Sequence, residues 1–238
     1  MTDQIVAFAL LGAEWVLYLL VALSVLSVAV MVERAMFFSR RSIDHAELQR
    51  EAVRAVLEDS PNALTKEFGQ NESMAVLVAL AGVEHRNSSI DAASEAMNSV
   101  KITAKESYEQ LTVILGTLGN NAPFIGLFGT VLGIIKAFND LQEDPTGGIN
   151  AVMGSTSEAL VATAVGILVA IPAVVAFNVF NRKMRAHLAH SDALAHAILG
   201  AMYKRKESSS TSAATKADKV KKTSEAQTKK SNKSQDQD

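Results

Sequence analysis

The amino-acid sequence predicts an all-α membrane protein with three transmembrane helices, the second and third of which are long and extend into a cytoplasmic helical collar. Three apolar segments reach the roughly 20 residues that a helix needs to cross a bilayer. Hydrophobic residues make up 48% of the chain, and the mean hydropathy is positive. The rest of the chain shows no alternation typical of strands. Helices alone are therefore expected.

The first transmembrane helix is expected at residues 15–33, after a short outer N-terminus at residues 1–14. The acidic residues Asp3 and Glu14 precede this segment, and basic side chains begin only after it, at Arg34. A cleavable signal peptide carries its positive charge on the opposite side. The segment is therefore interpreted as an uncleaved anchor.

Residues 34–110 are expected to form a cytoplasmic helical region. Ser60 followed by Pro61 is typical of an N-cap and the first turn of a helix. Ser88 with Asp91 three residues later is typical of a capping box. No proline follows this box before the second apolar segment, so one helix is expected to run from the box through that segment.

The second and third transmembrane helices are expected at residues 111–140 and 156–181, joined by a short periplasmic loop at residues 141–155. A cytoplasmic helical extension follows at residues 182–203. Residues 204–238 are rich in Lys and Ser with almost no apolar side chain, which predicts a disordered tail. Its lysines would favour an anionic inner leaflet, and a solvated tail without a specific role is the alternative.

The distribution of charged residues predicts the orientation of the chain in the membrane. Lysines and arginines follow the first and third apolar segments, whereas the short loop between the second and third contains Glu143 and Asp144 but no basic residue. Positively charged flanks stay in the cytoplasm. The N-terminus is therefore expected outside and the C-terminus inside.

Small residues line one face of each of the last two spans. Residues three or four apart on a helix share a face, and small side chains allow a neighbouring backbone to approach closely. The expected packing positions are Gly126, Gly129 and Gly133 on the second helix and Gly166 on the third. Pro123 and Pro172 remove backbone hydrogen bonds and are expected to kink these helices.

Thr130 and Thr163 are the hydroxyl residues expected to line a pore. A rise of 1.5 Å per residue places them roughly 13 and 10 Å below the outer ends of their helices, so at nearly the same level. Two hydroxyls at one depth on small-residue faces would form a polar ring if several subunits surrounded an axis. The alternative is that each hydroxyl bonds the carbonyl four residues back in its own helix.

Glu158 is the one charged residue of the segment 157–180. An ionisable group at the edge of a spanning helix, or inside it, is costly and is rarely retained without a partner or a polar pathway. The alternative is that Glu158 only marks the interface where the helix begins. Glu158 and Thr163 lie about 140° apart around the helix. Thr163 is therefore expected to face an enclosed channel, and Glu158 its mouth or an adjacent subunit.

Arrangements typical of catalysis or metal binding are absent from the sequence. There is no cysteine, which excludes disulfides and thiolate chemistry. His187 and His190 lie three residues apart, but nothing supplies the remaining ligands of a metal site. No nucleophile, base and orienting group cluster, and no phosphate-binding glycine loop is present. The chain is therefore predicted not to be an enzyme, and neither a cofactor nor a nucleic acid partner is expected.

The segments APFIGLFGTVLGI (122–134) and SEALVATAVGILVAIPAVVAFN (157–178) resemble the two signature stretches of the ExbB/TolQ/MotA proton-channel family, most of all its ExbB and TolQ branch. The resemblance implies a homopentamer in the bacterial inner membrane whose second and third helices line a central pore. It places Thr130 and Thr163 on the family's pore threonines and Glu158 on its glutamate.

The resemblance also implies partners for this ring. A smaller single-span membrane protein similar to ExbD or TolR would lie in the pore and contribute an aspartate. A TonB- or TolA-like energy transducer and membrane lipids are further expected partners. The implied function is a molecular motor that uses the proton-motive force for envelope work, such as TonB-dependent transport or Tol-Pal function.

Two departures from the family pattern leave alternatives open. Lys136 lies where ExbB and TolQ are expected to have a neutral polar residue or a histidine, and the lysine-rich tail is longer than the family minimum. Either feature could indicate a specialised motor of the same family, for gliding motility or polymer transport. A passive membrane scaffold, with Thr163 and Glu158 used only for packing, is the alternative from another class. A flagellar stator of the MotA kind is disfavoured because that branch has four spans.

Overall fold

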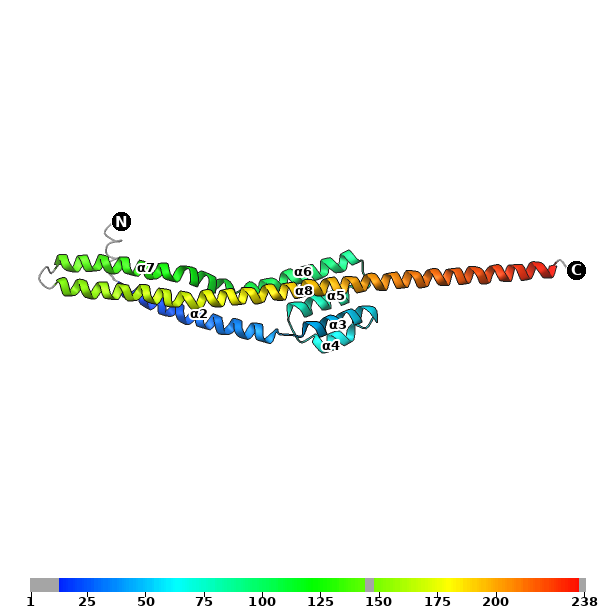
Figure 1. Cartoon of the computed structure of the whole chain (residues 1–238), viewed down its shortest axis with the longest axis horizontal. Coiled ribbons are helices and arrows are strands. Elements are labelled where there is room, and N and C mark those ends of the chain that lie inside the picture. Colours follow the sequence, from blue (N-terminus) through cyan, green and yellow to red (C-terminus); the bar gives the residue numbers. More distant parts are fainter. Residues whose placement is uncertain (1–12, 144–147, 236–238) are drawn as a thin grey trace. The chain divides into compact units, whose positions relative to one another are not determined.

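The computed structural model describes residues 13–143 and 148–235, and every regular element within these two ranges is an α-helix (Figure 1). The prediction of an all-α protein is confirmed for this part of the chain. Most of the predicted outer N-terminus and the middle of the predicted periplasmic loop lie outside the described residues. The helices are α2 (Glu14–Arg40), α3 (His45–Leu57), α4 (Pro61–Phe68), α5 (Met74–Glu84), α6 (Ile90–Glu109), α7 (Thr112–Glu143) and α8 (Gly148–Gln235).

Three of these helices are long and apolar enough to cross a membrane, in agreement with the three predicted spans. They are α2, α7 and the part of α8 that begins at Val152. α2 has 27 residues and α7 has 32, so both exceed the roughly 20 residues that a bilayer requires. Large apolar side chains such as Val25, Phe124 and Leu168 are exposed along them. Such a continuous apolar surface is suited to lipid or to neighbouring subunits.

The chain divides into two compact units. One comprises Met1–Ser42 together with Lys105–His187, and it contains the three apolar segments. The other comprises Ile43–Ala104 together with Leu188–Asp238, which includes most of the predicted cytoplasmic region. Because α6 and α8 each contribute residues to both units, two of the connections between the units are helical.

In the first unit, α2 packs against the pair formed by α7 and α8. Trp15 of α2 meets Phe128 of α7 edge-on, with 6.2 Å between the ring centroids. Most core side chains here are small or medium in size, which lets the helix backbones approach closely. The buried core comprises Val16, Leu20, Ala122, Leu132, Val169 and Ala170.

An aromatic cluster joins α2, α6 and α8 in the same unit. The rings of Phe38 and Phe180 are stacked with centroids 5.5 Å apart, and Tyr108 meets Phe38 edge-on at the same separation. His187 lies 5.3 Å from Tyr108, measured between ring centroids. Edge-to-face and offset contacts of this kind add to the stabilisation from apolar burial. The cluster therefore holds α2 and α8 together just where the predicted third span ends.

Arg34 is a buried cation beside this cluster, with 3% of its surface exposed. Its Nε and Nη2 donate hydrogen bonds of 2.5 and 2.9 Å to the carboxylate of Glu33. Its Nη1 donates at 3.1 Å to the carbonyl of Ser107, in the last turn of α6. A buried guanidinium is tolerated only with such partners. Arg34 therefore ties α2 to the end of α6.

The second unit packs α3, α4 and α5 against one another and against α8. Asp44 caps α3 by accepting hydrogen bonds from the amides of Ala46 and Glu47. Ser73 caps α5 in the same way, through the amide of Val76. The largest fully buried side chains of this core are Leu48, Leu64, Met74, Met97 and Ile198 together with the valines Val56, Val76 and Val78.

The single long helix expected through the second span is interrupted. α6 ends at Glu109, α7 begins at Thr112, and Leu111 between them has a positive φ of 44°. A branched residue in the left-handed region cannot continue a right-handed helix. The expected start also differs, because the hydroxyl that accepts from a first-turn amide belongs to Ser89, bonded to Ala92, rather than to Ser88. Ser60 makes no side-chain cap bond, although Pro61 does occupy the first turn of α4.

α8 is longer than the sequence indicates at both ends. It begins at Gly148, inside the predicted periplasmic loop, and continues to Gln235, through most of the segment for which composition predicts disorder. That segment contains no proline, and it is rich in Lys, a good helix former. Extending an existing helix avoids the cost of nucleation, so a polar sequence can follow the helix that precedes it.

Candidate functional site

The two spans that carry the candidate residues, α7 and α8, meet backbone to backbone through glycines. A Cβ added at Gly126 would lie 2.8 Å from the carbonyl oxygen of Ala162 and 2.9 Å from the Cα of Thr163. A Cβ added at Gly166 would lie 2.7 Å from the carbonyl oxygen of Ala122. Real Cβ atoms do not make such contacts, so only glycine fits at these two positions. The packing role predicted for both glycines is consistent with this geometry.

Gly129 and Gly133 continue the same contact towards the end of α7. A Cβ at Gly129 would lie 3.0 Å from the Cβ of Ala162 and 3.2 Å from Val16 of α2, and one at Gly133 would collide with Ala159. The four glycines therefore set the register between two antiparallel helices. Pro123 and Pro172 lie inside α7 and α8 respectively, and neither helix ends there.

Thr163 carries the one threonine hydroxyl that is buried and lacks a hydrogen-bond partner within the described residues. Its Cα lies against Gly126, so the hydroxyl belongs to the tightest part of the α7–α8 contact. A buried hydroxyl without a partner loses its hydration without compensation, which costs on the order of 1–3 kcal/mol. We expect the hydroxyl to bond a water molecule or a side chain of another protein chain.

Thr130 differs from Thr163 although the two are close in level. Its hydroxyl donates a hydrogen bond of 2.6 Å to the carbonyl of Leu127, three residues back in the same helix. The alternative that the hydroxyl bonds a carbonyl of its own helix therefore holds for Thr130, with a spacing of three rather than four residues. It does not hold for Thr163. Because Gly126 lies against Thr163, and Thr130 is four residues further along α7, the threonines are separated by about one helical turn or less.

Glu158 lies five residues before Thr163 on α8, about one and a half turns away, and is partly exposed. It makes no hydrogen bond or ion pair with any residue that the structure describes. The same holds for Lys136 of α7, which is half-buried. The cation and the carboxylate therefore do not neutralise each other within one chain. Thr130 and Thr163 therefore lie at similar levels of adjoining helices, and no hydrogen bond among the described residues joins Glu158 to either of them.

Two further polar features escaped the sequence reasoning. Ser155 donates a hydrogen bond of 3.2 Å to Asp140, which links the end of α7 to the start of α8. Ser27 of α2 is buried with 2% of its surface exposed, and its hydroxyl has no partner among the described residues. A serine inside an apolar span was the available signal for Ser27. No sequence signal indicated the contact between Ser155 and Asp140, because this pairing depends on where α8 begins.

The hydroxyl and carboxyl groups of this arrangement are of the kinds that bind and exchange protons. A hydroxyl both donates and accepts hydrogen bonds, and a carboxylate accepts them and can be protonated. Within the described chain no hydrogen-bonded path joins Glu158 to Thr163 or Thr130. No group of three or more potential metal ligands occurs among the described residues either. A conduction path would need groups or water molecules outside the single chain.

Comparison with known proteins identifies the family. The model of the MotA/TolQ/ExbB proton channel family matches residues 33–193, which is more than half of the chain and includes all of α7. The matched region contains the candidate residues Thr130, Glu158 and Thr163.

Several curated relatives match a shorter part of the chain. A biopolymer transport protein ExbB of Pseudomonas putida is 46% identical over 89 residues, which cover 37% of this chain and 27% of that protein. Proteins of the same name from Neisseria gonorrhoeae and Salmonella typhimurium are 50% identical over 82 residues and 44% identical over 75 residues. These matches cover 34% and 32% of this chain, and 37% and 31% of the relatives. The chain thus spans only about a third of the length of these relatives. Because the family model matches well over half of its length, the chain belongs to the MotA/TolQ/ExbB proton channel family.

Proposed function

We propose that this chain is the ring-forming subunit of a proton channel that converts the proton-motive force into work at the cell envelope. In this proposal several copies, expected to be five, surround an axis lined by α7 and α8. The chain would lie in the bacterial inner membrane with its N-terminus in the periplasm and its C-terminus in the cytoplasm.

The observation that carries the proposal is the unpartnered hydroxyl of Thr163 in the glycine-packed contact of α7 and α8. A helix that served only as an anchor would gain stability by placing an apolar side chain there. The polar atom is instead retained at the level of Gly126, in a member of a proton channel family. A hydroxyl that lacks a partner in the monomer is available to a water molecule or a partner side chain in an assembly.

The isolation of Glu158 supports a path that is completed by a second protein. Glu158 has no hydrogen-bond or ion-pair partner in the described chain, and about one and a half helical turns separate it from Thr163. A proton transferred between them would need an intermediate acceptor. A single-span partner similar to ExbD or TolR, with a membrane aspartate, would supply that acceptor inside the ring.

The relatives give the proposal its load. They are named biopolymer transport proteins, so we assign TonB-dependent transport ahead of Tol-Pal function, gliding motility or polymer export. A TonB-like energy transducer would then receive the work. Lys136 is half-buried, and in this proposal its charge would make the outer part of the path more positive.

Purification of the full chain from its native membrane in a mild detergent, followed by native mass spectrometry, tests the proposal. The expected result is a five-fold ring that holds a small single-span protein with an aspartate in its span. Any further protein in the complex would identify the load. Recovery of the chain alone, or as a dimer with unrelated proteins, would contradict the proposal and favour a passive scaffold.

A further inference from the structure

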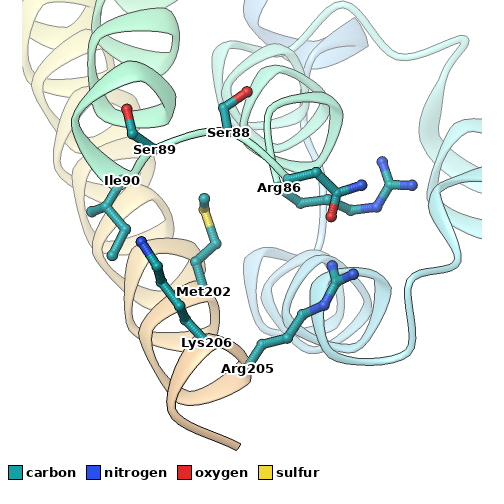
Figure 2. A pocket seen from close by; sticks show the side chains of 8 residues that line it. Arg86, Ser88, Ser89, Ile90, Met202, Arg205 and Lys206 are labelled. Carbon is teal, nitrogen blue, oxygen red and sulfur yellow. The ribbon is translucent and has the colours of Figure 1, made fainter. Parts of the chain in front are cut away.

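The second unit contains a basic pocket that the channel function does not use. Its volume is about 460 Å³, and it lies between the turn that joins α5 to α6 and the part of α8 near Met202. Figure 2 shows Ser88, Ser89 and Ile90 on one side of it and the α8 residues on the other. The lining residues are Arg86, Asn87, Ser88, Ser89, Ile90, Met202, Arg205 and Lys206.

The charges around this pocket are unequal. Its lining includes three cationic side chains, those of Arg86, Arg205 and Lys206, and no carboxylate. One nearby acid, Asp59, accepts a hydrogen bond of 2.5 Å from Nε of Arg86 and an ion-pair contact of 3.0 Å from Nη2 of Arg205. A single carboxylate therefore serves two guanidinium groups. The lining itself therefore carries cationic side chains without an acidic one.

The two guanidinium groups are held in place by further contacts. Arg86 donates from Nη1 to the carbonyl of Val83 at 3.1 Å, and Arg205 donates from Nη1 to the carbonyl of Val56 at 3.1 Å. Each guanidinium has five N–H donors. The contacts with the two carbonyls and with Asp59 do not use all of them, so both side chains can donate further hydrogen bonds to a ligand. Two cations fixed before a ligand arrives lose little freedom when it binds.

The remaining lining groups favour the same kind of ligand. Ser89 forms the N-cap of α6, and its hydroxyl accepts from the amide of Ala92 at 3.2 Å. Ile90 is the first residue of α6 and lines the pocket, so the positive end of that helix's dipole lies at the pocket edge. The hydroxyl of Ser88 provides a further donor. Several N–H and O–H donors with an excess of positive charge suit a compact oxyanion with several acceptor oxygens.

We propose that this pocket binds a phosphomonoester. Arg86 and Arg205, fixed by Asp59, would hold the ligand together with Lys206 and the Ser88–Ile90 turn. A phosphomonoester carries nearly two negative charges and three acceptor oxygens at neutral pH, which matches the charge excess and the donors of the pocket. The ligand is either a soluble phosphorylated metabolite or a lipid headgroup of the phosphatidic acid type. The site does not depend on the proposed channel function.

Calorimetric titration of inorganic phosphate into the full chain, held in nanodiscs of zwitterionic lipid, tests the proposal. We expect saturable binding with one phosphate per chain. Lys206→Gln should weaken it about tenfold, because one charge-assisted contact is lost. Ser88→Asp should abolish it, because the added carboxylate repels the anion. Neither change touches the core or the Asp59 contacts, so both variants are expected to fold.

Lys66→Gln is the matched control, since Lys66 is an exposed lysine on α4 outside the pocket. It removes the same charge from the same unit and should leave phosphate binding unchanged. Absence of saturable binding, or equal weakening by Lys66→Gln and Lys206→Gln, would overturn the proposal. Nanodiscs that contain phosphatidic acid separate the two sources. If phosphatidic acid in the nanodisc weakens phosphate binding, the ligand is the lipid headgroup. If phosphate binding is unchanged, the ligand is a soluble phosphomonoester.

Discussion

Gly126 of α7 lies directly against Thr163 of α8, so close that a Cβ on Gly126 would be 2.9 Å from the Cα of Thr163. This contact has two consequences. It brings two helix backbones together at the level of the candidate pore hydroxyls, and it encloses the hydroxyl of Thr163 without giving it a partner. The close helix packing at Gly126 and the buried hydroxyl of Thr163 therefore occur at the same place in the span, and a substitution at each residue tests them separately.

Gly126→Ala should destabilise the protein because the added methyl meets backbone atoms of Ala162 and Thr163 that cannot rotate away. Overpacking of this kind costs about 1–3 kcal/mol of the free energy of unfolding. Thermal unfolding in detergent measures the effect. Gly154→Ala is the control, because nothing lies within 4 Å of its added Cβ. Equal melting temperatures for the two variants would contradict the close contact.

Thr163→Val should remove proton flux while leaving stability almost unchanged. The hydroxyl has no partner in the described chain, so replacing it with a methyl group of similar size breaks no hydrogen bond. Proton flux into liposomes that contain the complete complex, measured with a pH-sensitive dye, should fall at least about tenfold, if the hydroxyl is part of the path. A variant with normal flux would favour the passive scaffold.

Thr130→Val provides the matched comparison for that experiment. Its hydroxyl already donates to the carbonyl of Leu127, so the substitution removes a bond that exists in the single chain. The free energy of unfolding should fall by about 0.5–1.5 kcal/mol. Thr130→Val should therefore lose more free energy of unfolding than Thr163→Val, and Thr163→Val should lose more proton flux than Thr130→Val. Identical stability losses would show that the two hydroxyls are equivalent.

The spans were predictable from sequence because their signal is local. About 20 apolar residues in a row require a membrane helix whatever the rest of the chain does. The glycine spacing on α7 likewise predicted which face would meet a neighbour, since Gly126, Gly129 and Gly133 share one side of the helix. By contrast, the different states of Thr130 and Thr163 depend on distances between helices, which a single helix pattern does not contain.

The break between α6 and α7 was not predictable for the same reason. No proline or glycine marks Gln110 or Leu111, so local propensity favours a continuous helix there. The contacts on either side are tertiary: Arg34 bonds the carbonyl of Ser107, and Tyr108 packs against Phe38. These contacts outweigh the cost of the positive φ at Leu111. The helical continuation of α8 into the polar C-terminal segment was not predicted, because composition alone does not show that the segment extends an existing helix.

Acidification should loosen the second unit through Asp59. Hydrogen bonding to Arg86, followed by the charge of Arg205, lowers the pKa of Asp59 below its usual value of 3.8. A carboxyl whose folded pKa is depressed contributes stability above the unfolded pKa, and this contribution is lost as the pH falls through the folded pKa. Unfolding monitored below about pH 4 should therefore show a decline that Asp59→Asn removes. Glu67→Gln, on the exposed face of α4, should leave the decline unchanged.

A second pH effect should appear near neutrality at the stacked imidazoles of His45 and His190, whose centroids are 4.1 Å apart. Burial, and then the charge of His190, lower the pKa of His45 below 6.5, while Asp44 opposes the shift. A histidine with a lowered folded pKa binds its proton more readily when unfolded, so stability rises with pH across this window and falls as the pH drops below about 6.5. His190→Gln removes the like charge and should raise the pKa of His45. Titration of the His45 ring by NMR measures this directly, with His196→Gln as the control. An unchanged pKa of His45 in His190→Gln would show that burial alone causes the shift.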